Sequence, residues 1–125
     1  MIDELKKLED VLKKYKSEYS WIHNMALLSR SGLVIASVLE NDFAEAKIAA
    51  IGAMLLSNAD RSLIASNSGE LNGIIIIGKE RKIILMPVDY HDTIIFQCES
   101  HINHDEVIDI ISKLINELLK LLGTL

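Results

Sequence analysis

The residues best suited to hold a metal ion are two histidines near the C-terminal end of the chain. His101 and His104 are three residues apart, and Asp105 and Glu106 follow directly. Imidazole nitrogens and carboxylate oxygens are ligands that zinc takes, so this spacing is compatible with a metal site. The segment also lies where a strand should give way to a helix, and Asn103 with Glu106 three residues later is typical of a helix N-cap. Capping and solvent exposure explain the segment more simply, so we predict no metal site.

No residue has the sequence setting of a catalytic nucleophile. Cys98 is the single cysteine, lies in an apolar run and has no CxxC partner, so we expect it to be a small buried side chain. Serine, histidine and aspartate occur, but none stands in a Gly-x-Ser-x-Gly frame. Asp89 and Asp92 are spaced for a turn. We therefore predict that the protein is not an enzyme and has no catalytic residues.

The sequence also contains no recognisable motif for binding a cofactor or a phosphate group. Gly69, Gly73 and Gly78 are too scattered for a glycine-rich phosphate loop. Arg30 and Arg61 are candidates for donating to a phosphate in another protein's active site, but solvated surface arginines would look the same. The net charge of −5 argues against non-specific nucleic-acid binding. We predict no cofactor and no nucleic-acid partner.

The elements that would position these residues form one domain over residues 1–125. Apolar periodicity predicts helices at 2–19, 42–66 and 104–122, and strands at 21–28, 33–39, 71–78, 82–88 and 93–98. The first two strands flank a turn at Arg30-Ser31-Gly32, and the last three have short connections, so an antiparallel meander is expected. Strands that are apolar on both sides need helices on both faces of the sheet, which predicts three layers.

The ends of the helix at 42–66 carry recognisable signals. We expect Asn41 or Asp42 to cap its start, with Glu45 three residues after Asp42 as in a capping box. The run Asn67-Ser68-Gly69 is expected to end it.

Four consecutive isoleucines, Ile74–Ile77, are the most unusual stretch of the chain. In a strand they place two large apolar side chains on each face, so both faces must be covered. Such a run would be an aggregation hazard at a bare sheet edge, so either the strand is central or another chain pairs with it. The chain is 50% hydrophobic but only 5% aromatic, and this surplus of aliphatic residues favours an oligomer.

The helix at 42–66 has two apolar sides that differ in residue size. At 100° per residue its large residues form one stripe that should dock on the sheet: Ile48, Ile51, Leu55 and Ala59. The stripe away from the sheet is made of small residues: Ala46, Ala49, Ala50, Ala53 and Ser57. Small residues let helix axes approach closely, so we predict a partner helix here, most simply from a second copy. The alternative is an alanine-rich helix that is simply exposed.

The cellular compartment follows from two observations. The lone Cys98 cannot form an intrachain disulfide, which fits a reducing cytoplasm. No run of 18 or more apolar residues is free of charge, so we expect no membrane insertion.

Three stretches of the sequence form a recognisable set: Ala26-Leu-Leu-Ser-Arg-Ser-Gly-Leu-Val-Ile-Ala-Ser37, Gly52-Ala-Met-Leu, and the isoleucine run followed by Ile83-Ile-Leu-Met-Pro-Val88. With them the sequence resembles the roadblock (dynein light chain) family, and within it the prokaryotic MglB-like group. The resemblance covers about residues 3–122. The three stretches are signatures of a fold and not of a catalytic site.

The resemblance implies a complete architecture and a class of partner. It implies an α/β domain of α+β type, in which a five-stranded antiparallel sheet lies between the central helix and the two terminal helices. The order of elements is α-β-β-α-β-β-β-α. Family members dimerise through the central helix and the strand after it, and they bind or regulate Ras-like small GTPases. The implied dimer interface comprises Ala46, Ala49, Ala50, Ala53, Ser57 and Ile74, Ile75, Ile76, Ile77.

The leading functional hypothesis is therefore a homodimeric adaptor or regulator of a Ras-like small GTPase. The partner would contact the central helix around Asp42, Glu45, Asp60 and Arg61. A small-molecule sensor is the alternative from another class, and it would need a pocket with convergent polar groups, which the aliphatic strands offer sparingly. A structural assembly subunit would have the same sequence features.

Overall fold

A computed structural model describes residues 2–123. Its helices are α1 (Ile2–Glu18), α2 (Glu45–Ala65) and α3 (His104–Leu122). Its strands are β1 (Ile22–Ser29), β2 (Val34–Val38), β3 (Ile74–Ile77), β4 (Arg81–Pro87) and β5 (Asp92–Glu99). The predicted order of elements is confirmed.

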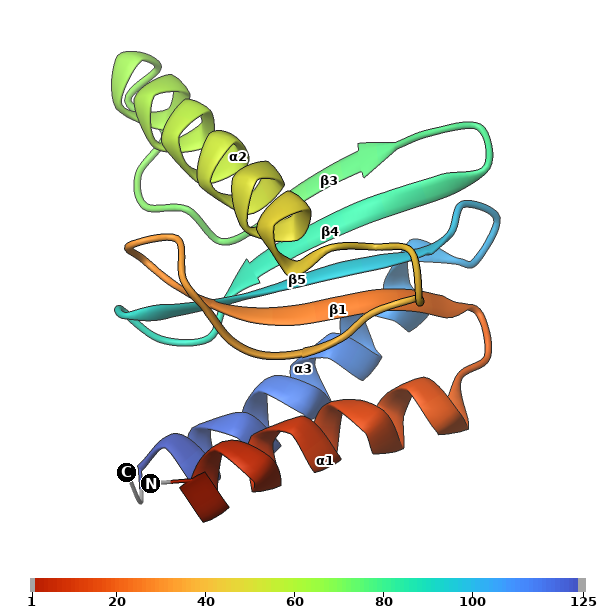
Figure 1. Ribbon diagram of the computed structural model, residues 1–125. Helices are drawn as coiled ribbons and strands as arrows, with labels where there is room; N and C mark the ends of the chain where they lie inside the picture. The colour runs from red at the N-terminus through yellow and green to blue at the C-terminus, as the bar shows by residue number, and fades with distance from the viewer. Residues whose placement is uncertain (1, 124–125) are drawn as a thin grey trace.

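The five strands form one antiparallel sheet in the order β2-β1-β5-β4-β3. Figure 1 shows three layers, with α2 on one face of the sheet and α1 with α3 on the other. The β1–β2 turn contains Gly32 at φ +87°, a conformation that glycine adopts without strain. The fold class expected from the resemblance is confirmed, including the assignment of each helix to its face.

The two faces of the sheet differ in the amount of core they carry. The larger core lies between the sheet and the terminal helices, and its fully buried members include Leu8, Phe96 and Leu114. The smaller core, on the α2 side, has only five buried members, which are Ala26, Leu28, Ile48, Leu85 and Ile95. The α2 face therefore depends on far fewer buried side chains.

The inner side of α2 rests on the sheet through Ile48, as predicted, and through Gly52, which the size pattern did not single out. These are the two buried residues of the helix, and Ile51 and Leu55 pack partly buried beside them. A Cβ at Gly52 would lie 2.3 Å from Leu28 Cδ1. Only glycine lets the helix approach β1 this closely.

The predicted capping box of α2 is wrong. The residue at its N-cap is Ala44, which makes no side-chain capping bond, while Asn41 and Asp42 lie in the preceding turn. The Glu45 carboxylate accepts a hydrogen bond from Ser37 Oγ at 3.1 Å instead. The start of α2 is thus held to the end of β2 by tertiary contacts, which a local motif does not report.

The isoleucine strand is shorter than predicted and lies at the edge of the sheet. The strand pairs with β4 only over Ile74–Ile77, whereas the sequence predicted a strand over residues 71–78. Its free edge has no partner strand among residues 2–123. Of the two expected alternatives, the central strand is excluded, and within one chain Ile75, Ile76 and Ile77 are all exposed.

Among the described residues, α2 is the one helix whose length and composition would suffice to cross a bilayer. Ile48 and Gly52 fix its inner side on the sheet, however, and Asp60 and Arg61 lie within it. A helix held in this way cannot be surrounded by lipid.

Candidate interaction surface

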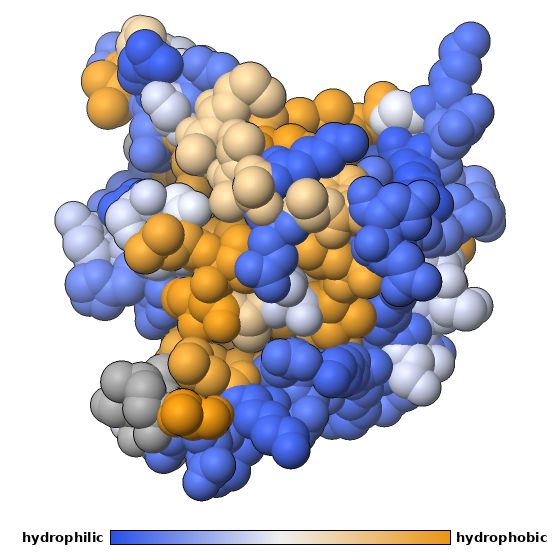
Figure 2. Space-filling view, viewed as in Figure 1, coloured by the Kyte–Doolittle hydropathy of each residue, from blue (hydrophilic) through white to orange (hydrophobic). Residues whose placement is uncertain are grey.

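The edge strand β3 exposes apolar side chains on both sides of the sheet. Strand register places Ile74 and Ile76 on the α2 side, and Ile75 and Ile77 on the side of the terminal helices. Ile75 is 43% exposed, Ile76 42% and Ile77 60%. Figure 2 shows apolar surface over α2 and along the part of the molecule that carries β3. A strand from another chain would cover both rows of side chains and bond the open edge.

The small-residue stripe of α2 is also open to solvent. Ala46, Ala50, Ala53 and Ser57 are exposed, and Ala49 is half-buried. Met54, 57% exposed, adds a larger apolar side chain to this outer surface. The predicted orientation of the helix is therefore correct for the two stripes, with Ile48, Ile51 and Leu55 toward the sheet and the small residues outward.

The two flanks of α2 face different parts of the molecule. On one flank a Cβ built on Gly32 would lie 3.8 Å from Ala53 Cβ, so Ala53 borders the β1–β2 turn. On the other flank Ala59 and Ser62 border the start of β3. Ala50 lies between these flanks, nearly opposite Ile48, and points most directly away from the sheet. A second copy that pairs at β3 would meet the Ser62 flank and the outermost residues before it reaches Ala53.

The four residues predicted to bind a partner do not form one cluster. Asp42 and Glu45 lie at the N-terminal end of α2, and Asp60 lies about 22 Å further along the helix. The Arg61 guanidinium bonds back to its own helix, with Nη2 3.1 Å from Ser57 Oγ. The structure thus separates an acidic N-terminal end from a second acidic site at Asp60.

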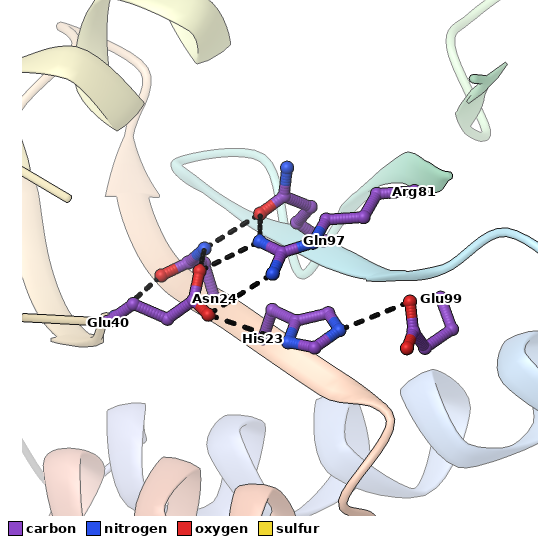
Figure 3. Close-up of polar contacts among 6 residues, drawn as sticks. All are labelled: His23, Asn24, Glu40, Arg81, Gln97 and Glu99. Carbon is purple, nitrogen blue, oxygen red and sulfur yellow. Dashed lines mark hydrogen bonds and ion pairs between the residues drawn. The ribbon is translucent and has the colours of Figure 1, made fainter. Parts of the chain in front are cut away.

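A polar network that the sequence did not reveal lies on the α2 side of the sheet, beyond the N-terminal end of the helix. Figure 3 shows its centre, where the Arg81 guanidinium meets the Glu40 carboxylate. The Nη1–Oε1 distance is 2.7 Å and the Nη2–Oε2 distance is 3.2 Å. Asn24 Nδ2 donates to Glu40 Oε1 at 3.1 Å and to Gln97 Oε1 at 2.7 Å. The Glu40 backbone N–H donates in turn to Asn24 Oδ1 at 2.7 Å.

This network fixes the chain between β2 and α2. Hydrogen bonds from Arg81, and then from Asn24, lower the pKa of Glu40 to about 2. His23 lies between two carboxylates: its Nδ1 is 3.6 Å from Glu40 Oε2, and its Nε2 is 3.3 Å from Glu99 Oε2. The bonds join β1, β4 and β5 to the segment that leads into α2, so they position the helix that carries the exposed stripe. The sequence signal was weak: isolated polar residues at positions that face one side of otherwise apolar strands.

On the opposite face of the sheet, Lys82 is fully buried. Its Nζ donates to the Ile102 carbonyl oxygen and lies 2.9 Å from His104 Nδ1. His104 is therefore engaged by a lysine, and His101 is exposed. Among residues 2–123 no three side chains of the metal-binding types come together.

Two further expectations about side-chain roles are confirmed. Cys98 is fully buried, and burial raises the pKa of its thiol to about 11, so the thiolate is disfavoured. Asp89 performs turn chemistry, since its Oδ1 accepts from the N–H groups of His91 and Asp92 at 2.8 Å.

Comparison with known proteins gives a result at the level of structure. No protein-family model matches the sequence, and no curated protein matches it. Among solved structures, MglB of Myxococcus xanthus superposes with a TM-score of 0.85 at 15% identity, covering 95% of this chain and 97% of that one. A Roadblock/LC7 domain from Streptomyces avermitilis superposes with a TM-score of 0.82 at 12% identity, and the match covers 92% of this chain and 97% of that one. The gliding protein MglB of Thermus thermophilus superposes with a TM-score of 0.81 at 11% identity, and the match covers 98% of this chain and 93% of that one. The chain has the roadblock fold.

Proposed function

We propose that this protein is a homodimeric, non-enzymatic adaptor that binds a Ras-like small GTPase in the cytoplasm and regulates it. The observation that carries the dimer is the bare edge of β3, with three exposed isoleucines directed to both sides of the sheet. Soluble proteins protect such edges, because an open apolar strand pairs with other chains. A second copy that pairs antiparallel with β3 would join two five-stranded sheets into one.

The total surface of the single chain supports an assembly. The accessible surface is 7373 Å², whereas a monomeric protein of 14.0 kDa exposes about 6,700 Å². The exposed isoleucines of β3 and the exposed Met54 of α2 contribute to this excess.

Support for a GTPase partner comes from the fold and the resemblance. Three neighbours in structure are MglB proteins and a roadblock domain, and each spans nearly the whole chain. The roadblock resemblance of the sequence implies binding to Ras-like GTPases through the surface built on the paired central helices. The proposed contact residues are Asp42, Glu45, Asp60 and Arg61.

The test of the GTPase partner is a binding measurement with the Ras-like GTPases of the source cell. Each purified GTPase would be loaded with GDP or with a non-hydrolysable GTP analogue and titrated against this protein by calorimetry. We expect one GTPase to bind more tightly in one nucleotide state, and its hydrolysis rate would then be measured with and without this protein. Absence of binding to every GTPase in both states would contradict the proposal and leave a structural assembly subunit as the better description.

Substitutions that introduce a charged side chain test the proposed dimer interface separately. Ala50→Glu places a carboxylate on the outermost line of α2, and Ile77→Lys places an ammonium group on the open edge strand; both positions are exposed in the single chain. Each variant should keep its fold and lose the dimer. Ala53→Glu is a less clean test, because Ala53 borders the β1–β2 turn.

A further inference from the structure

A groove lies under the C-terminal half of α2, where the helix extends beyond the sheet (Figure 1). Its volume is about 770 Å³. Leu56 and Leu63 of α2, together with Leu71 after it, provide apolar walls. Arg30 of the β1–β2 turn and Tyr90 of the β4–β5 turn form the opposite side.

The charges around this groove are unbalanced. Asp60, Glu70 and Asp89 line it with three carboxylates, against the single guanidinium of Arg30. Arg30 lies 4.8 Å from the centre of the Tyr90 ring and is turned toward that ring. Within residues 2–123, Asp60 and Glu70 form no ion pair. The groove therefore offers unpaired negative charge beside apolar walls.

Two exposed apolar side chains extend the walls outward. Ile64 of α2 and Tyr90 of the β4–β5 turn both line the groove, and each is 76% exposed. Leu56, Asp60 and Ile64 follow one another at four-residue spacing along one side of α2, over about 12 Å. This length matches about two turns of a helix laid in the groove.

We propose that this acidic groove (Asp60, Glu70 and Asp89 beside Leu56, Leu63 and Leu71) binds a short amphipathic segment of the partner GTPase that carries lysine or arginine next to apolar residues. The inference rests on the proposed function and adds the chemistry of the contact. Basic residues match the carboxylates, and apolar residues match the leucine walls. A small molecule fits less well, because Glu70, Asp89 and Tyr90 stand exposed around an open groove and would enclose little of it.

The groove reaches both flanks of α2, since Leu63, Glu70 and Leu71 also line the hollow beside the start of β3. The flank that borders β3 carries Ala59 and Ser62. Asp60 and Ile64 lie on the flank that also carries Ala53, next to the β1–β2 turn. A second copy that pairs with β3 from its open edge therefore leaves the side of the groove that carries Asp60 and Ile64 accessible.

The test is a nuclear magnetic resonance titration of the ¹⁵N-labelled protein with two synthetic twelve-residue helical peptides. One peptide carries lysine and leucine on one face, and the other has glutamate in place of each lysine. We expect saturable amide shifts at Asp60, Glu70 and Tyr90 with the lysine peptide only. Asp60→Lys should weaken this binding about fivefold, and Asp60→Asn by a smaller factor in the same direction. Asp10→Lys makes the same change in net charge on α1, across the sheet, and should leave the affinity unchanged.

Each of the following outcomes would overturn the inference. Shifts that map away from the groove, or equal weakening by Asp60→Lys and Asp10→Lys, would mean non-specific attraction to an acidic protein. Saturable shifts at the same amides with lysine methyl ester alone would mean a site for a small cation. A GTPase that binds the wild type and the Asp60→Lys variant equally would refute the groove and Asp60 as a contact residue, and would leave GTPase binding itself as the function. Peptide binding without any GTPase binding would refute the proposed function and the assignment of the bound segment to a GTPase. The groove would still be shown to prefer basic segments.

Discussion

Helices α2 and α3 are of similar length, but they are held in very different ways. Five of the 19 residues of α3 are buried, against two of the 21 residues of α2. The side chain of Asn103 caps α3 by accepting from the N–H groups of Asp105 and Glu106, whereas the N-cap residue of α2 is an alanine. A helix that buried so little would be a poor element of a monomer, since helices in proteins are stabilised chiefly by packing of an apolar face. The difference shows that α3 is anchored in the core of the chain, whereas most of α2 lies outside it.

The same contrast holds for the two faces of the sheet. The face under α1 and α3 carries a continuous core, and the face under α2 carries a small core beside a polar network and an open groove. Changes on the first face should therefore reduce the stability of each chain. Changes on the outer side of α2 should instead alter association and leave the fold of each chain intact.

The largest effect is expected in α3. Leu114→Ala removes a fully buried side chain and should lower the free energy of unfolding by about 2–5 kcal/mol. Leu119→Ala on the same helix is the control, because Leu119 is partly exposed, and it should cost less than about 1 kcal/mol. Urea unfolding at one fixed protein concentration measures both. Equal losses would mean that α3 is not anchored as described.

The next effect concerns the close contact of α2 with the sheet. Gly52→Ala would place a Cβ 2.3 Å from Leu28 Cδ1, and Leu28 is buried and cannot swing away freely. We expect a loss of about 1–3 kcal/mol from overpacking. Ser57→Ala, at an exposed position of the same helix, should change stability by less than about 0.5 kcal/mol. A stabilising Gly52→Ala would show that helix propensity outweighs the contact.

Substitutions at the N-caps of α3 and α2 should change the stability of the protein in opposite directions. Asn103→Ala removes both bonds to the start of α3 and should cost about 1 kcal/mol. Ala44→Asp adds a capping oxygen where none exists; the backbone there is already extended, at φ −75° and ψ 142°. It should stabilise the protein by up to about 1 kcal/mol. Thermal unfolding of both variants checks the pair, and a loss at Ala44→Asp would contradict the assignment of this position as an unused cap.

The smallest effect is the pH dependence supplied by Glu40. Its pKa in the folded protein is lowered from 4.5 to about 2 by the hydrogen bonds from Arg81 and Asn24. A lowered carboxyl pKa stabilises the fold above the unfolded value, and this contribution is lost as the pH falls from about 4.5 toward 2. Both Glu40 and Arg81 are about one-third exposed, so we expect less than about 1 kcal/mol.

The measurement for Glu40 is urea unfolding between pH 2.5 and pH 6. Glu40→Gln should flatten the pH dependence in this window. Glu70→Gln, which removes a carboxylate without an ion pair, should leave it unchanged. An unaltered slope in Glu40→Gln would show that the ion pair contributes nothing to stability.

The sequence predicted those features that depend on local pattern. Apolar periodicity is sufficient to locate the helices, and the Asn103 cap is encoded within four residues. The predicted cap of α2 was wrong because Glu45 bonds Ser37, on a strand eight residues earlier. The Glu40–Arg81 pair joins residues 41 positions apart, and the contact of Gly52 with Leu28 depends on how α2 crosses the sheet. Such partners are chosen by the tertiary fold, which a single sequence read along its length does not specify.

The most direct test of the proposed dimer is the molar mass in solution, measured by size-exclusion chromatography with light scattering over a dilution series. We predict a mass of about twice 14.0 kDa that persists on dilution and falls to that of one chain in Ala50→Glu and in Ile77→Lys. A wild-type chain that remains at 14.0 kDa up to high concentration would contradict it. The exposed β3 edge and the outer face of α2 would then not be an interface between two copies.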